Sequence, residues 1–181
     1  MPATALLLID FINDLAYEGG ERLASRALAA ARNAARLKLR ARRSRVPVIY
    51  VNDNFGHWRS DFREVVARCE ATSPEAAALV DAIRPDDEDF FVLKPRNSAF
   101  FQTPLEVLLA ELRTRRLVLS GLTADNCVLF TANDAHLRGF EIVVASDCVA
   151  SIRPADRASA LKHMAAVDKA AIRASAAVRW A

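Results

Sequence analysis

Cysteine is scarce in this sequence, and an apolar run of bilayer length is absent. The three cysteines, Cys69, Cys127 and Cys148, are odd in number and form no Cys-x-x-Cys pair, which excludes a disulfide framework, a zinc ribbon and a thioredoxin-type motif. The apolar run near the start, Ala5 to Ile9, is far shorter than the roughly 20 residues that span a membrane. No basic segment precedes it, so a signal peptide is not expected. We therefore expect a cytoplasmic protein with reduced thiols and no membrane partner.

The sequence also has no large excess of charge of one sign. It contains 25 basic and 22 acidic residues, and its net charge is +3. This balance predicts no nucleic-acid partner. The basic residues crowd one stretch that contains no aromatic side chain. We interpret this stretch as the solvated C-terminal end of a long helix, where cations complement the helix dipole. It contains Arg36, Lys38, Arg40, Arg42, Arg43 and Arg45.

Length and composition are those of one globular domain. The chain has 181 residues, of which 52% are hydrophobic and 26% charged, and no linker, repeat or low-complexity segment divides it. Strand-like apolar runs alternate with helix-like segments, which predicts an α/β fold: a single domain over residues 1–181, with three layers (α/β/α) and a mainly parallel sheet of about six strands. The predicted strands are Ala5–Ile9, Val46–Val51, Asp89–Leu93, Arg116–Ser120, Glu141–Ala145 and a short one near Ala170–Arg173. The predicted helices are Glu21–Arg43, Asp61–Cys69, Pro74–Ile83, one opening at Thr103–Pro104, Asn126–Arg138 and Pro154–Ala166.

Three chemically distinct side chains follow the ends of predicted strands. Asp10 ends the first, Lys94 ends the third, and Cys127 begins the helix after the fourth. Because ligand crevices of parallel sheets lie beyond the carboxyl ends of the strands, we expect the three to meet. A carboxylate can accept the thiol proton, while an ammonium and a helix N-terminus favour a thiolate. No histidine is placed to substitute for Asp10.

Four segments, in order along the chain, resemble the isochorismatase-like cysteine hydrolase superfamily, which includes nicotinamidases and N-carbamoylsarcosine amidohydrolase. The resemblance covers nearly the whole chain, and the turn around Cys127 is its most specific part. The matching segments are Leu7–Asp14 (LLIDFIND), Leu93–Phe100 (LKPRNSAF), Gly121–Val128 (GLTADNCV) and Ser146–Ser151 (SDCVAS).

The resemblance implies a role for each residue of the expected site. Asp10 would be the base, Lys94 a stabiliser and Cys127 the nucleophile. It also implies a cis peptide bond between Leu122 and Thr123, with the backbone N–H groups of Thr123 and Cys127 directed at the oxyanion. The family commonly forms homodimers or homotetramers, and its substrates are small molecules.

The sequence departs from the family pattern after the second strand. Nicotinamidases carry an Asp-x-His metal motif there. Asp53 matches the aspartate, but Phe55 stands in place of the histidine. A metal site built from Asp53, His57 and Asp61 remains conceivable if the segment is helical, although zinc sites generally use more nitrogen or sulfur ligands. We predict no metal and no cofactor.

The aromatic residues near these segments are candidates for the substrate pocket. Phe55 and Trp58 belong to the loop predicted over Asn52–Ser60, and Phe100 follows the lysine segment. We predict that these three side chains line the pocket. The alternative is that they only pack the loops. A polar contact is also missing near the pocket, because Ile12 stands where the family often has glutamine.

Together these features predict a metal-independent cysteine hydrolase that cleaves a small amide-type C–N bond through a thioester. An ester or ureido hydrolase using the same three residues is one alternative. A non-catalytic small-molecule-binding or thiol-redox protein is another, and Cys148 would then be the candidate resolving thiol.

Overall fold

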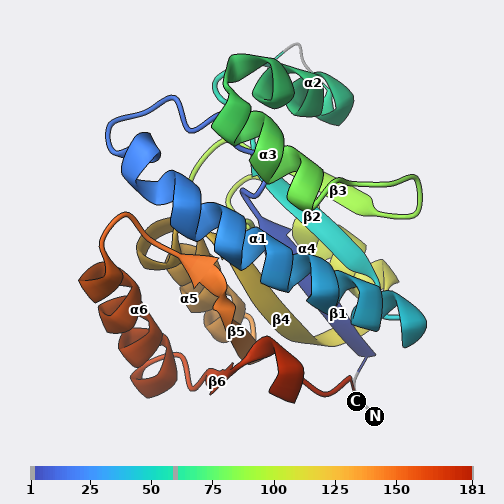
Figure 1. Ribbon diagram of the computed structural model, residues 1–181. Helices are drawn as coiled ribbons and strands as arrows, with labels where there is room; N and C mark the ends of the chain where they lie inside the picture. Colours follow the sequence, from blue (N-terminus) through green and yellow to red (C-terminus); the bar gives the residue numbers. More distant parts are fainter. Residues whose placement is uncertain (1–2, 59–60, 181) are drawn as a thin grey trace.

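The computed structural model describes residues 3–58 and 61–180. Its centre is a six-stranded, all-parallel sheet in the order β3-β2-β1-β4-β5-β6 (Figure 1). The strands are β1 (Ala3–Ile9), β2 (Val48–Asp53), β3 (Phe90–Lys94), β4 (Thr114–Leu122), β5 (Glu141–Ala150) and β6 (Ala171–Arg173). The helices are α1 (Gly20–Arg43), α2 (Phe62–Thr72), α3 (Pro74–Ala82), α4 (Leu105–Glu111), α5 (Leu129–Leu137) and α6 (Pro154–Ala166), with a π-helix η1 (Ala124–Val128) and a 3-10 helix η2 (Ser175–Ala177). The predicted single-domain α/β fold is confirmed.

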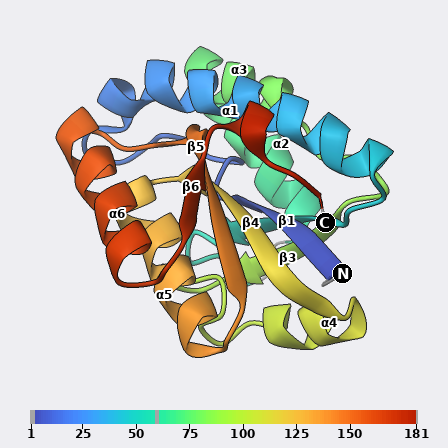
Figure 2. The ribbon, with the colours of Figure 1, turned by 90° about the horizontal axis from the view of Figure 1, so that it is seen from below.

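Two hydrophobic cores separate the three layers. Along β1, Leu6 and Leu8 face one core and Leu7 and Ile9 face the other, because successive side chains of a strand point to opposite faces. The first core lies beneath α1, α2 and α3, and the second beneath α4, α5 and α6. Figure 2 shows this sandwich, with α1 and α3 on one side of the sheet and α4 and α5 on the other. A strand covered on both faces explains why the run Ala5–Ile9 is continuously apolar.

Helix α1 packs its alanine-rich face against the sheet. Leu23, Ala27, Ala30, Ala34 and Leu37 are buried, and their spacing of three or four residues keeps them on one stripe of the helix. Small side chains bring the helix axis close to the strands, and alanine also has the highest helix propensity. The predicted helix over Glu21–Arg43 is therefore confirmed.

The basic stretch at the end of α1 is only partly solvated, which corrects the prediction. Lys38 is buried, and its Nζ lies 2.5 Å from an Asp89 carboxylate oxygen. Arg42 pairs with the same carboxylate at 2.7 Å. Arg40 donates to the carbonyl oxygens of Ser175 and Val178. These cations anchor β3 and the C-terminal segment to α1, a role that helix periodicity alone does not reveal.

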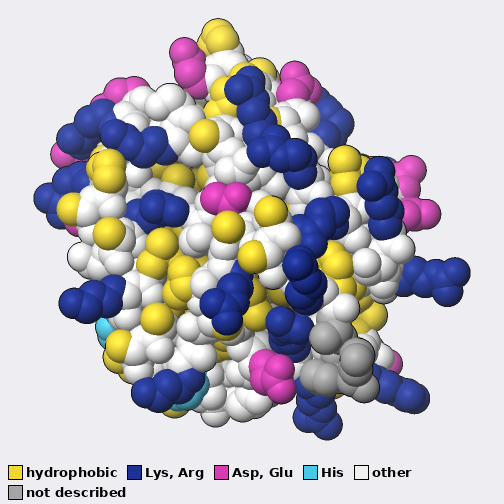
Figure 3. Space-filling model, turned by 60° about the horizontal axis from the view of Figure 1, so that its bottom comes forward, with side chains coloured by type: hydrophobic (Ala, Val, Ile, Leu, Met, Phe, Trp, Pro, Cys, Tyr) yellow, Lys and Arg dark blue, Asp and Glu magenta, His cyan; other side chains and the backbone are white. Residues whose placement is uncertain are grey.

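The surface crossed by α1 carries charges of both signs. In Figure 3 the Lys and Arg side chains are spread over this face, with acidic and apolar groups between them. No helix of the described residues is long and apolar enough to cross a membrane.

Candidate active site

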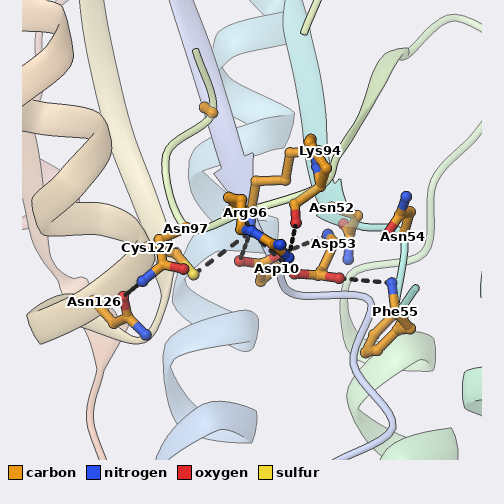
Figure 4. A network of polar contacts seen from close by, with 12 residues as sticks. Asp10, Asn52, Asp53, Asn54, Phe55, Lys94, Arg96, Asn97, Asn126 and Cys127 are labelled. Atoms are coloured by element: carbon orange, nitrogen blue, oxygen red, sulfur yellow. Dashed lines mark hydrogen bonds and ion pairs between the residues drawn. The ribbon is translucent and has the colours of Figure 1, made fainter. Parts of the chain in front are cut away.

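Asp10, Lys94 and Cys127 meet at the carboxyl end of the sheet. Lys94 Nζ lies 2.9 Å from Asp10 Oδ2 and 3.5 Å from Cys127 Sγ. In Figure 4 the three side chains point toward one another, and Asn97 and Asn126 form a hydrogen bond beside Cys127. The structure therefore brings together the three residues that were singled out from the ends of three predicted strands.

Backbone contacts with β2 hold the Asp10 carboxylate in place. Asp10 directly follows β1 and adopts a left-handed conformation with φ of 51°, which aspartate tolerates better than most residues. Its N–H donates to Val51 O at 2.9 Å, and its Oδ1 accepts from Asp53 N at 2.7 Å. The neighbouring strand thus orients one carboxylate oxygen and leaves the other toward Lys94.

Lys94 is fully buried, with 0% of the residue exposed. Its ammonium compensates for this burial with several polar partners. Besides Asp10 and Cys127, Nζ donates to Arg96 O at 3.1 Å and lies 3.7 Å from Asp53 Oδ2. Since β3 is an edge strand, the side chain reaches inward across the end of β2 toward β1. A buried lysine with this set of partners is part of a polar site and not a surface residue.

The turn that carries Cys127 needs a glycine at its base. Gly121 has φ of +145°, and a Cβ added there would lie 2.2 Å from Ile9 O. The following peptide bond, between Leu122 and Thr123, is cis, as the family resemblance implies. The segment Ala124–Val128 is a π-helix and α5 begins only at Leu129, which differs from the ordinary helix predicted from Asn126. The spacing of apolar residues does not distinguish a π-helix from an α-helix, and π-helical turns occur often at functional sites.

Polar side chains tie the lysine segment to α5. Thr131 Oγ1 donates to Cys127 O at 2.7 Å and accepts from Ala99 N at 3.0 Å. Ser98 Oγ donates to Asp134 at 2.5 Å. We call these contacts the α5 clamp. Sequence reasoning missed them, because Thr131 and Asp134 are ordinary helical residues until the fold places Ala99 beside them.

Burial controls the charges of the site. Burial foremost, and then the Asp10 carboxylate, raise the pKa of the Cys127 thiol, and the opposing effect of Lys94 is smaller. Lys94 thus favours the thiolate in the expected direction, but burial and Asp10 outweigh it, so the net pKa of the thiol is raised. Burial also raises the pKa of Asp10 against the opposing effect of Lys94. For Lys94 itself burial lowers the pKa, but Asp10, Cys127 and Asp53 outweigh it, so the net direction is upward.

Tyr17 is a neighbour of the site that sequence reasoning also missed. It lies in the loop between β1 and α1 and is 40% exposed. Burial, followed by electrostatic effects of Asp10 and of the Cys127 side chain, raises the pKa of its phenol to about 12. The hydroxyl therefore keeps its proton at neutral pH and can donate a hydrogen bond. The sequence signal that could have indicated Tyr17 is its position, as an aromatic residue in the loop that follows the first predicted strand.

The three predicted pocket aromatics lie in different environments. Phe100 is 5% exposed and belongs to the second core, with its ring 5.9 Å from that of Phe140. Phe100 therefore packs in the core against which Cys127 also packs, and its place in the pocket wall stays a prediction. Trp58 is 79% exposed. Phe55 is partly buried, and its ring is covered by the guanidinium of Arg68. The remaining residues of the predicted loop, 59 and 60, lie outside the described residues.

A family model for the isochorismatase domain matches residues 4–176. The chain belongs to the isochorismatase family. It is 38% identical over 160 residues to the uncharacterized isochorismatase family protein YaaI of Bacillus subtilis (strain 168), an alignment that covers 88% of this chain and 87% of that protein. Two similar solved structures are nicotinamidase PncA from Bacillus subtilis (TM-score 0.72, 29% identity, 93% of this chain and 98% of that one) and N-carbamoylsarcosine amidase from Thermoplasma acidophilum (TM-score 0.70, 28% identity, 98% and 99%). The predicted family and the predicted class of enzyme, an isochorismatase-like hydrolase, are confirmed.

In the described part of this isochorismatase-family chain, the positions of the nicotinamidase metal motif do not form a metal ligand set. Asp53 Oδ1 accepts from Phe55 N, and Phe55 stands where the motif has histidine. Asp61 is the N-cap of α2, where its side chain accepts from Glu64 N. The stretch around His57 is a turn and not a helix. Within 3–58 and 61–180, no three His, Cys, Asp or Glu side chains are grouped so as to hold a metal ion, so the residues present do not fit a metal.

Proposed function

We propose that this isochorismatase-family hydrolase is a metal-independent cysteine amidohydrolase. Its reaction is the cleavage of a small amide-type C–N bond through a thioester on Cys127. The observation that carries the proposal is the contact of one buried ammonium with both a carboxylate and a thiol, at 2.9 and 3.5 Å. Such a group holds a proton acceptor, a cation and a nucleophile in one water-poor site.

The first half of the reaction forms the thioester. Asp10 accepts the Cys127 proton as Sγ attacks the substrate carbonyl carbon, so the high pKa of the resting thiol is overcome only when substrate is present. Lys94 keeps the charge of the site balanced. The N–H groups of Thr123 and Cys127 are the proposed donors to the tetrahedral oxyanion. Asp10 then returns the proton to the leaving nitrogen, the C–N bond breaks, and an amine or ammonia departs.

The second half repeats these roles with water. Asp10 accepts a proton from the water that attacks the thioester carbonyl. The C–S bond breaks and the proton passes to the departing thiolate, which restores the Cys127 thiol and releases a carboxylic acid. Besides the substrate and water, the proposed steps use only groups of this chain, because protons pass between Asp10, Cys127, water and the leaving group.

The comparisons support an amide substrate. The titles of two similar structures name a nicotinamidase and an N-carbamoylsarcosine amidase, and both names denote hydrolysis of C–N bonds. An ester or ureido compound would use the same three residues. A small-molecule substrate, the absence of a nucleic-acid partner, and a homodimer or homotetramer stay predictions.

The thiol-redox alternative is opposed by the position of Cys148. That residue belongs to the core beneath α1, whereas Cys127 packs against the core beneath α5. The two thiols therefore lie on opposite faces of the sheet, and all three cysteines are free. A resolving cysteine has to reach the sulfur that it reduces.

Trapping of the thioester tests the proposal. Purified protein is incubated with a panel of small primary amides, ammonia release is measured, and hydroxylamine is added to intercept the acyl group as a hydroxamate. We expect turnover and hydroxamate with the wild type, neither with Cys127→Ser, and both with Cys148→Ser, the matched control. Unchanged turnover in Cys127→Ser, or ammonia release without hydroxamate, would contradict a Cys127 thioester.

A further inference from the structure

Asp53 presents one unused carboxylate oxygen beside the reacting groups. It ends β2, and its Oδ1 accepts from Phe55 N at 2.6 Å. Its Oδ2 lies 3.7 Å from Lys94 Nζ, which is longer than a hydrogen bond, and it accepts no hydrogen bond from the residues that the structure describes. The unpartnered side-chain oxygens that are buried in the described chain are those of Asn52 and Thr114. Asp53 Oδ2 is therefore open to solvent, in a side chain that is 38% exposed.

The neighbouring carboxylate of Asp10 has no oxygen to spare. Its Oδ1 accepts from Asp53 N at 2.7 Å, its Oδ2 lies 2.9 Å from Lys94 Nζ, and the residue is 5% exposed. Both oxygens are held by the chain, as suits a group that exchanges a proton with Cys127. Asp53 is therefore the carboxylate of this site that remains for a ligand.

The open oxygen is close to the nucleophile. Lys94 Nζ lies 3.5 Å from Cys127 Sγ and 3.7 Å from Asp53 Oδ2, so these two atoms are at most about 7 Å apart. Figure 4 shows Asp53 next to Asp10, on the side away from Cys127, and both Cys127 and Asp53 are partly exposed. A small molecule whose carbonyl carbon meets Sγ needs only a few further bonds to place a second group at Asp53.

The charges of the site leave a negative excess. With Asp10 ionised, as the proposed mechanism requires, two carboxylates flank one ammonium. Lys94 is the only cation in the described part of the chain that forms an ion pair with either carboxylate, and the exposed Arg96 turns its guanidinium to Pro95 O at 3.2 Å. The Cys127 thiol adds no positive charge, and burial foremost raises its pKa. A cationic ligand therefore balances the site.

The surroundings of Asp53 select the kind of cation. A metal ion does not fit, because within 3–58 and 61–180 no three His, Cys, Asp or Glu side chains are grouped to hold one. An alkylammonium group has three N–H donors. One of them makes a charge-assisted hydrogen bond to a carboxylate oxygen while the others stay hydrated on the exposed side. A carboxylate ligand would instead meet Asp53 as a like charge.

We propose that Asp53 Oδ2 binds an ammonium group carried by the substrate itself. The substrate class is then a small amide with a protonated amine at its other end, such as the amide of an ω-amino acid. Cys127 attacks the amide end while Asp53 holds the amine and takes no part in bond breaking. This inference rests on the proposed function, since it assigns the substrate class of the same site.

Matched pairs of amides test the inference by binding, without hydrolysis. β-Alaninamide, 4-aminobutanamide and 5-aminopentanamide are compared with butanamide, pentanamide and hexanamide, in which a methyl group replaces the ammonium. Affinities are measured calorimetrically at pH 7 on Cys127→Ala protein, alone and combined with Asp53→Asn, Asp53→Glu or Asp125→Asn. Asp125 is an exposed aspartate two residues before Cys127, and its replacement removes the same charge near the site without touching Asp53.

We expect at least one amino amide to bind about tenfold or more tightly than its neutral partner, as expected for a charge-assisted contact. Asp53→Asn should abolish this preference, Asp53→Glu should retain part of it, and Asp125→Asn should leave it unchanged. Equal binding within every pair, a preference that survives Asp53→Asn, or one that Asp125→Asn removes equally, overturns the inference. Should Asp53→Asn fail to fold, Asp53→Ser takes its place with the same expected and opposing results.

Hydrolysis by the wild type is measured separately with the same six amides. An ammonium preference in binding without ammonia release or hydroxamate from any of them leaves the Asp53 inference standing and counts against the proposed function. Turnover with equal kcat/KM for charged and neutral partners does the reverse.

Discussion

Replacing Lys94 by methionine should destabilise the protein in a pH-dependent manner. Methionine keeps most of the side-chain volume but removes the ammonium that lies 2.9 Å from Asp10 Oδ2. Asp10 is 5% exposed, so its carboxylate is left buried beside no cation. Removing one partner of a buried ion pair typically costs about 3–5 kcal/mol. We expect a loss of that size at pH 7.

Protonation of Asp10 limits this loss. An aspartic acid carboxyl in water has a pKa of 3.8. Starting from that value, protonating the carboxylate costs about 4.4 kcal/mol at pH 7 and about 1.6 kcal/mol at pH 5, at 1.36 kcal/mol per pH unit. Without Lys94 the folded-state pKa of Asp10 rises further above its unfolded value. The stability of the variant is then highest below the pKa that Asp10 has in the unfolded chain, and it is lost as pH rises through the pKa that Asp10 has in the folded protein. The variant should therefore approach the wild type at pH 5.

Urea unfolding followed by circular dichroism at pH 5 and pH 7 measures both effects. The double variant Asp10→Asn/Lys94→Met removes both charges and should recover most of the loss at pH 7. A Lys94→Met cost below about 1 kcal/mol at pH 7 would refute the buried ion pair. A cost that is equal or larger at pH 5 would refute the assignment of the charge to Asp10.

Two further predictions concern the metal and the turn. Because Phe55 replaces a ligand and Asp61 caps α2, overnight dialysis against EDTA should leave amide turnover unchanged; a loss that zinc restores would contradict this. Gly121→Ala should cost about 3 kcal/mol or more of unfolding free energy, since its Cβ would lie 2.2 Å from Ile9 O at φ of +145°. Gly139→Ala, which has a positive φ but no neighbour within 4 Å of the added Cβ, should cost only about 1–2 kcal/mol by the same urea assay. Similar costs for the two would show that the clash at Gly121 relaxes.

Much of the site could be predicted because parallel sheets collect strand ends. The apolar runs before Asp10 and Lys94 mark two such ends, and Cys127 follows the end marked by Gly121. Lys94 and Asp10 are 33 and 117 positions away from Cys127 in the sequence. The topology of the sheet brings them together, so no short motif spacing is needed to predict the contact. The parallel direction of the strands follows equally from the alternation of helix and strand.

The remaining features depend on contacts that one-dimensional patterns do not contain. Thr131 looks like any helical threonine, and Arg68 like any surface arginine, until the fold places Ala99 and Phe55 beside them. The burial of Phe100 in the second core could not be predicted either, because sequence does not show whether an aromatic residue in a loop is buried or exposed. Lys38 was misplaced for a related reason, because helix periodicity does not show which charged side chain meets Asp89.

The α5 clamp has a consequence for how this site can change. Thr131 joins the backbone of Cys127 to that of Ala99, five residues beyond Lys94, so the clamp ties the segment that carries the thiol to the segment that carries the ammonium. The loops that carry Tyr17 and Phe55 lie outside the α5 clamp. Substitutions there can alter which molecules are accepted while the reacting atoms keep their spacing, so substrate range and bond-breaking chemistry are free to diverge independently.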